Sequence, residues 1–321
     1  MNSRIYQASK IIIKRDSLKN TIVEENHYKA TKDTMYQIAS CSKFITGILV
    51  AILNEQGILD YDTDINRYLK SYKCPQKITL RHLLTYTSGS TDDNGYLGLE
   101  PQSKLVSSTK DSVIGKSYSK PFSLNATHLG HITEPVGSKF RYSGAGYTLI
   151  QLVIEDLTGI PLYKLMKKYI FDKLNMKHST GKLLYEDKHK YNIASMDYLY
   201  RMYPETAAAG VWMSVNDLSI LLQDIMNGYN YNTSKILKQE TILMITKGEH
   251  PEWNKDNCNY GLGMFVNESK GKKLFAHDGN NYGYKMHFHC IPQKQYIEIL
   301  MFNHNPKNHF GFEKELRNLL R

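Results

Sequence analysis

Short β-prone runs lie near both ends of the 321-residue chain, and apolar runs with helical spacing lie between them. Near the start, residues 11–14 and 21–24 flank a polar segment, which predicts a hairpin. Near the end, predicted strands cover residues 260–266, 273–277, 285–292 and 296–302. Strands from both ends bury their apolar faces most simply in one shared layer. We therefore predict a sheet built from the two ends of the chain, with a helical insertion.

The spacing of apolar residues predicts helices at residues 40–56, 79–84, 147–157, 162–174, 215–226 and 310–320. Thr79 and Ser214 stand where a hydroxyl side chain can cap a helix N-terminus. Residues 88–120 are rich in Ser, Asp, Gly and Lys, which predicts a long surface loop. A mainly helical lobe is expected at residues 61–204. A sheet lobe is expected at residues 1–60 and 205–321.

The composition, with 41% hydrophobic and 22% charged residues, is typical of a globular protein. A net charge of +10 could attract an anionic partner, such as a nucleic acid or a cell-wall polymer. The lysines are scattered and no basic run alternates with aromatic residues, so we expect a solvated basic surface and no nucleic-acid partner. The oligomeric state is left open.

No run of about 18 apolar residues predicts a membrane span. The first six residues also lack the charged-then-apolar layout of a signal peptide. The chain as given is therefore expected to be cytoplasmic. An extracellular or cell-envelope location is the alternative if a leader segment is missing from the sequence.

Neither a metal nor an organic cofactor is expected. None of the four cysteines belongs to a C-x-x-C pair, so we predict unpaired buried thiols. His287 and His289 alternate along a predicted strand and share one face of it. They could be metal ligands, but no third ligand stands at a motif spacing, and a polar solvent-facing side explains them equally well.

Three short motifs, in chain order, can carry chemistry. The first is Ser40-x-x-Lys43, at the start of a predicted helix. The second is Tyr142-Ser143-Gly144, and the third is His277-Asp278-Gly279 at the end of a predicted strand. The Ser-x-x-Lys spacing also occurs in four other, polar stretches, which start at Ser107, Ser117, Ser179 and Ser269.

A serine hydroxyl becomes a good nucleophile only when a nearby base takes its proton. Lys43 follows Ser40 by one helical turn, so its amine can reach that hydroxyl and accept the proton when neutral. Tyr142 could relay the proton or act as the base. The backbone N–H groups of Ser40 and Asn280 could bind an oxyanion. Gly279 would let the backbone approach the substrate closely.

These motifs and their surroundings resemble the serine β-lactamase and penicillin-binding-protein superfamily, above all its class C β-lactamase-like group of esterases and D-amino-acid peptidases. The resemblance spans about residues 31–303 and is carried by residues 37–43 (QIASCSK), 79–89 (TLRHLLTYTSG), 140–147 (FRYSGAGY), 207–212 (AAAGVW) and 260–263 (YGLG). It implies an α+β fold, in which an antiparallel sheet flanked by helices stands beside an all-helical lobe. The site would lie between the two lobes.

The resemblance also implies roles for individual residues. Ser40 would be the acylated nucleophile, and Lys43 and Tyr142 would form the proton-transfer pair. His277 would face the substrate. Trp212 could form a wall of the substrate cleft, and core packing is the alternative for this side chain.

The sequence departs from the family pattern at two positions. Gly144 replaces the asparagine of the usual Tyr-x-Asn motif, which removes an amide expected to contact the substrate or Lys43. We keep Gly144 among the candidate substrate-binding positions. His277 replaces a lysine of β-lactamases and many penicillin-binding proteins, and a neutral imidazole attracts a substrate carboxylate less strongly than an ammonium group does. Both departures weaken the case for penicillin as the natural substrate.

The sequence therefore predicts a serine hydrolase that forms an acyl-enzyme. Its substrate would be a small-molecule ester, or an amide of a D-amino acid or short peptide. A penicillin-binding D,D-carboxypeptidase or weak β-lactamase is one alternative. A non-catalytic sensor of cell-wall ligands on the same scaffold is another.

Overall fold

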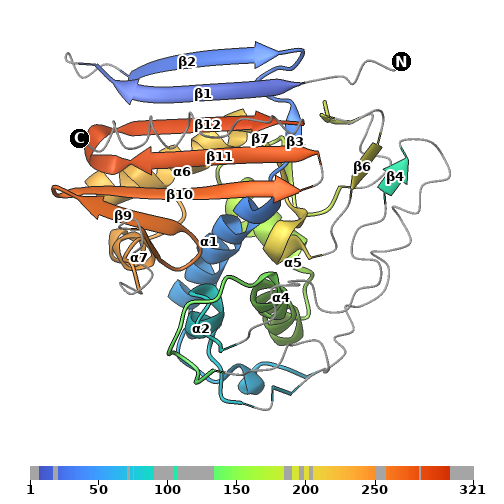
Figure 1. Cartoon of the computed structure of the whole chain (residues 1–321), viewed down its shortest axis with the longest axis vertical. Helices are drawn as coiled ribbons and strands as arrows, with labels where there is room; N and C mark the ends of the chain where they lie inside the picture. Colours follow the sequence, from blue (N-terminus) through green and yellow to red (C-terminus); the bar gives the residue numbers. More distant parts are fainter. Residues whose placement is uncertain are drawn as a thin grey trace.

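The computed structural model describes residues 7–16, 21–70, 73–74, 76–89, 105–107, 134–183, 190–194, 199–201, 205–249, 258–281 and 283–303. Its main feature is a seven-stranded antiparallel sheet (Figure 1). In spatial order the strands are β2 (Thr21–Tyr28), β1 (Ala8–Arg15), β12 (Tyr296–Phe302), β11 (Tyr284–Ile291), β10 (Lys272–Asn281), β9 (Phe265–Ser269) and β8 (Cys258–Tyr260).

The two ends of the chain meet in this sheet, which confirms the central prediction from the sequence. Strands β1 and β2 form the predicted hairpin, and β1 also pairs with β12, where Ile11 lies opposite Ile299. Ile11, Ile13 and Ile299 are buried on the face that carries the helices. Alternation along these strands therefore places one apolar row in the core.

Helices cover this face and extend beyond it. Helix α6 (Val215–Tyr231) lies behind the sheet in Figure 1, and α1 (Ser42–Glu55) starts next to β10 and runs away from the sheet. Helices α2 and α4 lie further from it. The other α-helices among the described residues are α2 (Leu80–Leu84), α4 (Gly144–Thr158), α5 (Leu162–Met166) and α7 (Gln239–Ile245). This arrangement is the predicted α+β fold. Within the described part of the chain, no helix is long and apolar enough to span a membrane.

The described residues also form a three-stranded and a two-stranded sheet. Strand β7 (Trp212–Ser214) pairs with β3 (Met35–Gln37) on one side and with β5 (Ser179–Thr180) on the other. Strand β4 (Leu105–Ser107) pairs with β6 (Leu199–Arg201). The pairing of β3 with β7 brings residues 35–37, just before the first motif, beside residues 212–214.

The predicted helix caps are present. The Thr79 side chain accepts a hydrogen bond from the backbone N–H of His82, and the His82 ring accepts one from the Thr79 backbone, so α2 begins with a reciprocal capping box. The Ser214 side chain accepts from the N–H of Asp217 at the start of α6. In both caps, a side-chain oxygen accepts a hydrogen bond from a backbone N–H group that has no partner within the helix.

Three predicted elements differ from the structure. The predicted helix 162–174 is α helical only to Met166, and a π-helical turn follows over Lys167–Phe171. The predicted strand 260–266 is interrupted between β8 and β9, where Gly263 has φ +110°. A Cβ atom on Gly47 of α1 would lie 2.3 Å from the Leu262 carbonyl oxygen, so this interruption packs directly on α1. The predicted strand 273–277 does not end at His277, because β10 continues to Asn281.

The predicted helix 310–320 and most of the predicted loop 88–120 lie outside the described residues. The division into lobes at residues 60 and 204 stays a prediction.

Candidate active site

The candidate nucleophile lies in a strained turn at the start of α1. Ser40 is half-buried and is the middle residue of a 3-10 turn over Ala39–Cys41, one turn before the α-helix proper begins at Ser42. Ala39 has φ 49°, a left-handed conformation that is uncommon for a residue with a side chain. The surrounding structure holds it there, since Ile38 N–H donates to the Val211 carbonyl at 3.0 Å and Cys41 N–H donates to Ile38 at 3.0 Å. Strain of this kind is often concentrated at functional sites.

Lys43 is buried beside the Ser40 hydroxyl. Only 1% of Lys43 is exposed. Its Nζ atom lies 3.1 Å from Ser40 Oγ and donates a second hydrogen bond of 2.8 Å to the carbonyl oxygen of Ala208. Ala208 belongs to a π-helical turn over Thr206–Gly210, which we call the 206–210 turn. The structure therefore brings together the serine and lysine of the first motif, and the 206–210 turn fixes the amine.

Two aromatic rings lie near the Lys43 amine. Its Nζ atom lies 5.1 Å from the ring centroid of Tyr142 and 5.6 Å from that of Tyr147, within the range of cation–π attraction. The turn that carries Tyr142 is fixed by Ser143, whose Oγ atom accepts from the N–H of Gly146 and caps α4. Gly144 is the first residue of α4. The second motif thus contributes the Tyr142 ring to the surroundings of Lys43, and Gly144 contributes no side chain.

His277 is a buried, neutral ring. It is 1% exposed, and burial, followed by the nearby Lys43 charge, lowers its pKa to about 4. Its Nδ1 atom must donate to the Asp278 carbonyl oxygen at 2.7 Å, so Nε2 accepts a hydrogen bond from the Tyr260 hydroxyl at 3.0 Å. Both ring nitrogens are used inside the protein. Burial and these two hydrogen bonds fix the tautomer of the ring and keep it uncharged, and the role of His277 towards the substrate stays a prediction.

A cluster of tyrosines joins the three motifs and was missed by sequence reasoning. The Tyr86 ring lies 4.5 Å from Tyr142, 5.4 Å from Tyr147 and 4.8 Å from Tyr260, measured between centroids. The hydroxyl groups of Tyr86 and Tyr260 are 3.4 Å apart, and Tyr147 donates to the Leu84 carbonyl. Burial raises the pKa of Tyr86, Tyr147 and Tyr260. The available signal was that all three stand in the sequence stretches that carry the family resemblance.

Strand β10 packs directly on residues 38–41, the turn that carries Ser40. A Cβ atom on Gly279 would lie 2.2 Å from the Ile38 carbonyl oxygen, so only glycine allows this approach. The Cys41 thiol donates to the His277 carbonyl at 3.3 Å, and Asn281 donates to the Gln37 side chain at 2.7 Å. Gly279 therefore serves the contact between β10 and the turn that carries the nucleophile.

Asn280 and Trp212 have different surroundings. Asn280 is exposed on β10 opposite Lys285 of β11, at the end of β10 that lies beside the nucleophile turn. Its backbone N–H stays a predicted oxyanion donor. Trp212 is completely buried on β7, with its ring 5.2 Å from that of Tyr284 in an edge-to-face contact. The prediction that Trp212 walls the substrate cleft is therefore corrected in favour of core packing.

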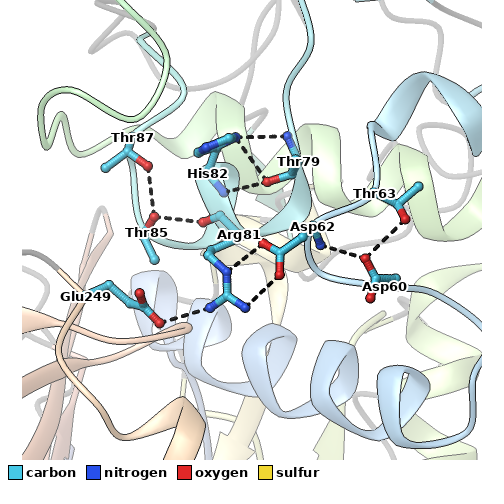
Figure 2. Close-up of polar contacts among 9 residues, drawn as sticks. All are labelled: Asp60, Asp62, Thr63, Thr79, Arg81, His82, Thr85, Thr87 and Glu249. Atoms are coloured by element: carbon cyan, nitrogen blue, oxygen red, sulfur yellow. Dashed lines mark hydrogen bonds and ion pairs between the residues drawn. The ribbon is translucent and has the colours of Figure 1, made fainter.

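A polar clasp fixes the helix that positions Tyr86 (Figure 2). Arg81 on α2 binds both carboxylate oxygens of Asp62, at 2.7 and 3.0 Å, and its third nitrogen lies 3.0 Å from Glu249. The Arg81 hydrogen bond lowers the pKa of Asp62. Glu249 in turn donates its N–H to the Tyr260 carbonyl at 3.0 Å. The clasp therefore joins the segment before Tyr86 to the segment that carries Tyr260.

His287 and His289 lie in a chain of polar contacts on the other face of the sheet. His287 Nδ1 bonds to the Asp278 carboxylate, and His287 Nε2 lies 3.2 Å from His289 Nδ1. His289 Nε2 is 3.6 Å from Glu298, which also pairs with Lys10 at 2.6 Å. Within the described residues, no group of three or more His, Cys, Asp or Glu side chains has the geometry to hold a metal ion.

Comparisons with known proteins agree with this geometry. The sequence model of the family described as Beta-lactamase matches residues 16–320. The "Penicillin-binding protein 4*" of Bacillus subtilis (strain 168) is 24% identical over 266 residues, which cover 78% of this chain and 57% of that protein. The chain spans about 60% of the length of the curated relatives that it matches.

Solved structures show the same fold. The penicillin-binding protein from Bacillus halodurans superposes with a TM-score of 0.71 at 18% identity, and covers 97% of this chain and 95% of its own. The D-amino acid amidase from Ochrobactrum anthropi SV3 gives a TM-score of 0.69 at 19% identity, with 98% and 94% of the two chains covered.

The structure places a half-buried serine beside a buried lysine at the start of α1, an arrangement that fits the serine hydrolase class. The chain belongs to the Beta-lactamase family, because the family model matches nearly its whole length.

Proposed function

We propose that this chain is a serine hydrolase that forms an acyl-enzyme on Ser40. The observation that carries the proposal is the 3.1 Å approach of the buried Lys43 Nζ to Ser40 Oγ. A nucleophile and its base must lie within hydrogen-bond reach, and this pair does. Membership of the Beta-lactamase family supports the same chemistry.

In the first half of the reaction, Ser40 Oγ attacks the substrate carbonyl carbon and loses its proton to the neutral amine of Lys43. The oxygen of the tetrahedral intermediate is held by the N–H groups of Ser40 and Asn280. The proton then passes to the leaving alcohol or amine, with Tyr142 beside Lys43 as the second proton carrier. In the second half, water attacks the acyl-serine and gives its proton to the same pair. The pair returns this proton to Ser40 Oγ as the bond to the acyl carbon breaks and the acid is released.

The proposed substrate is an ester, or an amide of a D-amino acid or small peptide. Two of the similar structures are described as a D-amino acid amidase and a "Beta-lactamase/D-alanine Carboxypeptidase", and curated relatives are described as putative D-alanyl-D-alanine carboxypeptidases. These descriptions support hydrolysis of acyl bonds next to D-amino acids. A D,D-carboxypeptidase or weak β-lactamase activity is the alternative within this chemistry.

One observation favours a second candidate, a non-catalytic sensor that is acylated but does not turn over. Gly144 brings no side-chain amide to the Lys43 surroundings, so deacylation would lack that group. A sensor would form a stable adduct with a labelled penicillin at Ser40 and would show no ester turnover.

The test is labelling and turnover of the purified protein with a fluorophosphonate, a labelled penicillin and a short-chain nitrophenyl ester. We expect ester hydrolysis and fluorophosphonate labelling in the wild type, and the loss of both in Ser40→Ala. Ser269→Ala is the matched control, because Ser269 has the same spacing to a lysine but lies at the end of β9. Ester turnover that survives in Ser40→Ala would overturn the assignment of the nucleophile.

A further inference from the structure

A buried glutamine on α4 is hydrogen-bonded to the 206–210 turn. Gln151 is 5% exposed, and its Oε1 atom accepts a hydrogen bond of 3.1 Å from the backbone N–H of Ala207. The N–H groups of the three following residues of the turn converge instead on the Glu205 carbonyl oxygen. The turn therefore takes the partner of the Ala207 N–H from another element of the fold, helix α4.

The orientation of the Gln151 amide is fixed from both sides. A backbone N–H group can only donate, so the amide oxygen must face Ala207. The Nε2 atom then faces Glu155, one helical turn further along α4, and donates to its Oε1 atom at 3.3 Å. The same oxygen of Glu155 accepts a hydrogen bond of 2.8 Å from the N–H of Leu162. Glu155 therefore holds the amide in the orientation that suits the Ala207 N–H.

The backbone of Ala207 lies next to the acceptor of the Lys43 amine. Its N–H is bonded to α4, and its carbonyl oxygen accepts from the Thr46 hydroxyl of α1 at 2.9 Å. The next carbonyl along the chain, that of Ala208, accepts from Lys43 Nζ at 2.8 Å. The same Nζ atom lies 3.1 Å from Ser40 Oγ. A shift of Ala207 would therefore move the acceptor that orients the amine.

We propose that Gln151 is a positioning residue, which orients the Lys43 amine towards Ser40 through the 206–210 turn. It acts on the backbone that carries the acceptor of the amine, so its loss should slow the chemical step and leave substrate binding unchanged. This inference rests on the proposed function, because it concerns the base of the same Ser40 site. A misplacement of about 1 Å in a reacting group costs on the order of 100-fold in rate.

The first experiment measures kcat and KM for nitrophenyl acetate in Gln151→Met, which keeps an unbranched side chain of similar length and removes the amide. We expect kcat to fall by about 30-fold and KM to stay within about twofold of the wild type. The control is Gln223→Met, because Gln223 is partly buried on α6 and donates to the Ser219 carbonyl of its own helix. It should keep the wild-type kcat. An unchanged kcat in Gln151→Met would overturn the inference.

A second experiment asks whether Gln151 acts through the lysine. The rate at which a fluorophosphonate labels Ser40 reports on the nucleophile even when ester turnover is lost. Gln151→Met should slow labelling when Lys43 is present, but should change it by less than about twofold when combined with Lys43→Met. Equal effects in the two backgrounds would show a general structural role and would overturn the inference.

Exchange of the two polar side chains on α4 provides a rescue. Gln151→Glu keeps the acceptor for Ala207 but sets its second oxygen against the Glu155 carboxylate, so kcat should fall by about tenfold. Adding Glu155→Gln restores a donor between the two side chains and should return kcat to within about threefold of the wild type. No recovery in this double variant would contradict the inference. The proposed function fails separately, namely if nitrophenyl acetate hydrolysis is absent or survives in Ser40→Ala.

Discussion

Two buried ionisable side chains, Lys43 and Glu205, lie at the 206–210 turn and differ in their hydrogen bonds. Lys43 donates to Ser40 and to the Ala208 carbonyl of the turn, and faces two aromatic rings. Glu205 immediately precedes the turn and is fully buried, but neither of its carboxyl oxygens has a hydrogen-bond partner. Burial raises the pKa of Glu205 to about 7.

The difference shows two ways in which a protein can accommodate a buried ionisable group. A buried amine is tolerated when each direction around it offers an acceptor or an aromatic face, and this arrangement also aims Lys43 at Ser40. A buried carboxyl group without partners avoids the cost of its charge by holding its proton. The first arrangement is suited to chemistry, and the second makes stability depend on pH.

The largest expected effect is the loss of ester turnover when Lys43, the hydrogen-bonded side chain of the two, is replaced. Lys43→Met keeps an unbranched side chain of similar length but removes the amine, so ester turnover should fall by about 10³-fold, the scale of general base catalysis. Circular dichroism should show the fold retained. Lys167→Met, on an exposed lysine, is the control and should keep full activity. Activity within tenfold of the wild type in Lys43→Met would show that another group takes the proton.

Replacing Glu205, whose carboxyl group has no hydrogen-bond partner, should change the pH dependence of the free energy of unfolding. The Glu205 pKa is about 7 in the folded protein and about 4.5 when unfolded, so the folded state binds the proton more tightly. The wild type should therefore lose stability as pH rises from 4.5 through 7, by about 3 kcal/mol at pH 8. Glu205→Gln should lack this loss.

Urea unfolding at pH 5 and pH 8 measures the effect of Glu205. The control is Glu240→Gln, which removes an exposed carboxylate of α7 and should keep the wild-type pH dependence. An equal loss of stability in wild type and Glu205→Gln would show that Glu205 is not the group that titrates.

His277 is a third buried ionisable side chain that can be compared with Lys43 and Glu205, and both of its ring nitrogens are hydrogen-bonded. Its pKa is about 4 when folded and about 6.5 when unfolded, so the unfolded state takes up the proton first as the pH falls. Stability should decrease from pH 6.5 towards pH 4, opposite in sign to the Glu205 effect. By pH 5 the contribution of one such histidine is about 2 kcal/mol.

Unfolding of wild type and His277→Asn between pH 7 and pH 5 measures this contribution. The slope of the unfolding free energy against pH should be smaller in His277→Asn by the amount that one bound proton contributes. Part of the slope should remain. The remaining slope comes from His289, whose pKa burial lowers to about 3. Identical slopes in the two proteins would contradict a neutral His277 in the folded state.

The smallest effect concerns the aromatic faces around Lys43. Tyr147→Phe keeps the ring and loses only the hydroxyl that donates to Leu84, so turnover should stay within about threefold of wild type. Tyr147→Leu removes a cation–π contact of about 1 kcal/mol, so turnover should fall by about fivefold or more. The measurement is kcat/KM for the nitrophenyl ester. Equal rates in the two variants would show that the ring face does not support the amine.

Much of the fold and the approach of Lys43 to Ser40 could be predicted from local patterns. The β-prone runs at both ends, the caps Thr79 and Ser214, and the one-turn spacing of Ser40 and Lys43 depend on residues close in the sequence. The tyrosine cluster could not be predicted in this way, because residues 86, 147 and 260 meet only when α2, α4 and β8 pack together. The same holds for the burial of Trp212, since one aromatic residue is compatible with a cleft or with a core.

The sequence alone determined the candidate catalytic residues and their order along the chain. The charge and accessibility of those residues were decided by the tertiary structure. Lys43 is fixed by a carbonyl group 165 residues away, His277 is neutral because it is buried, and its neighbour Asp278 remains exposed. Desolvation and hydrogen bonds between distant segments set these states, and both depend on how the whole chain packs.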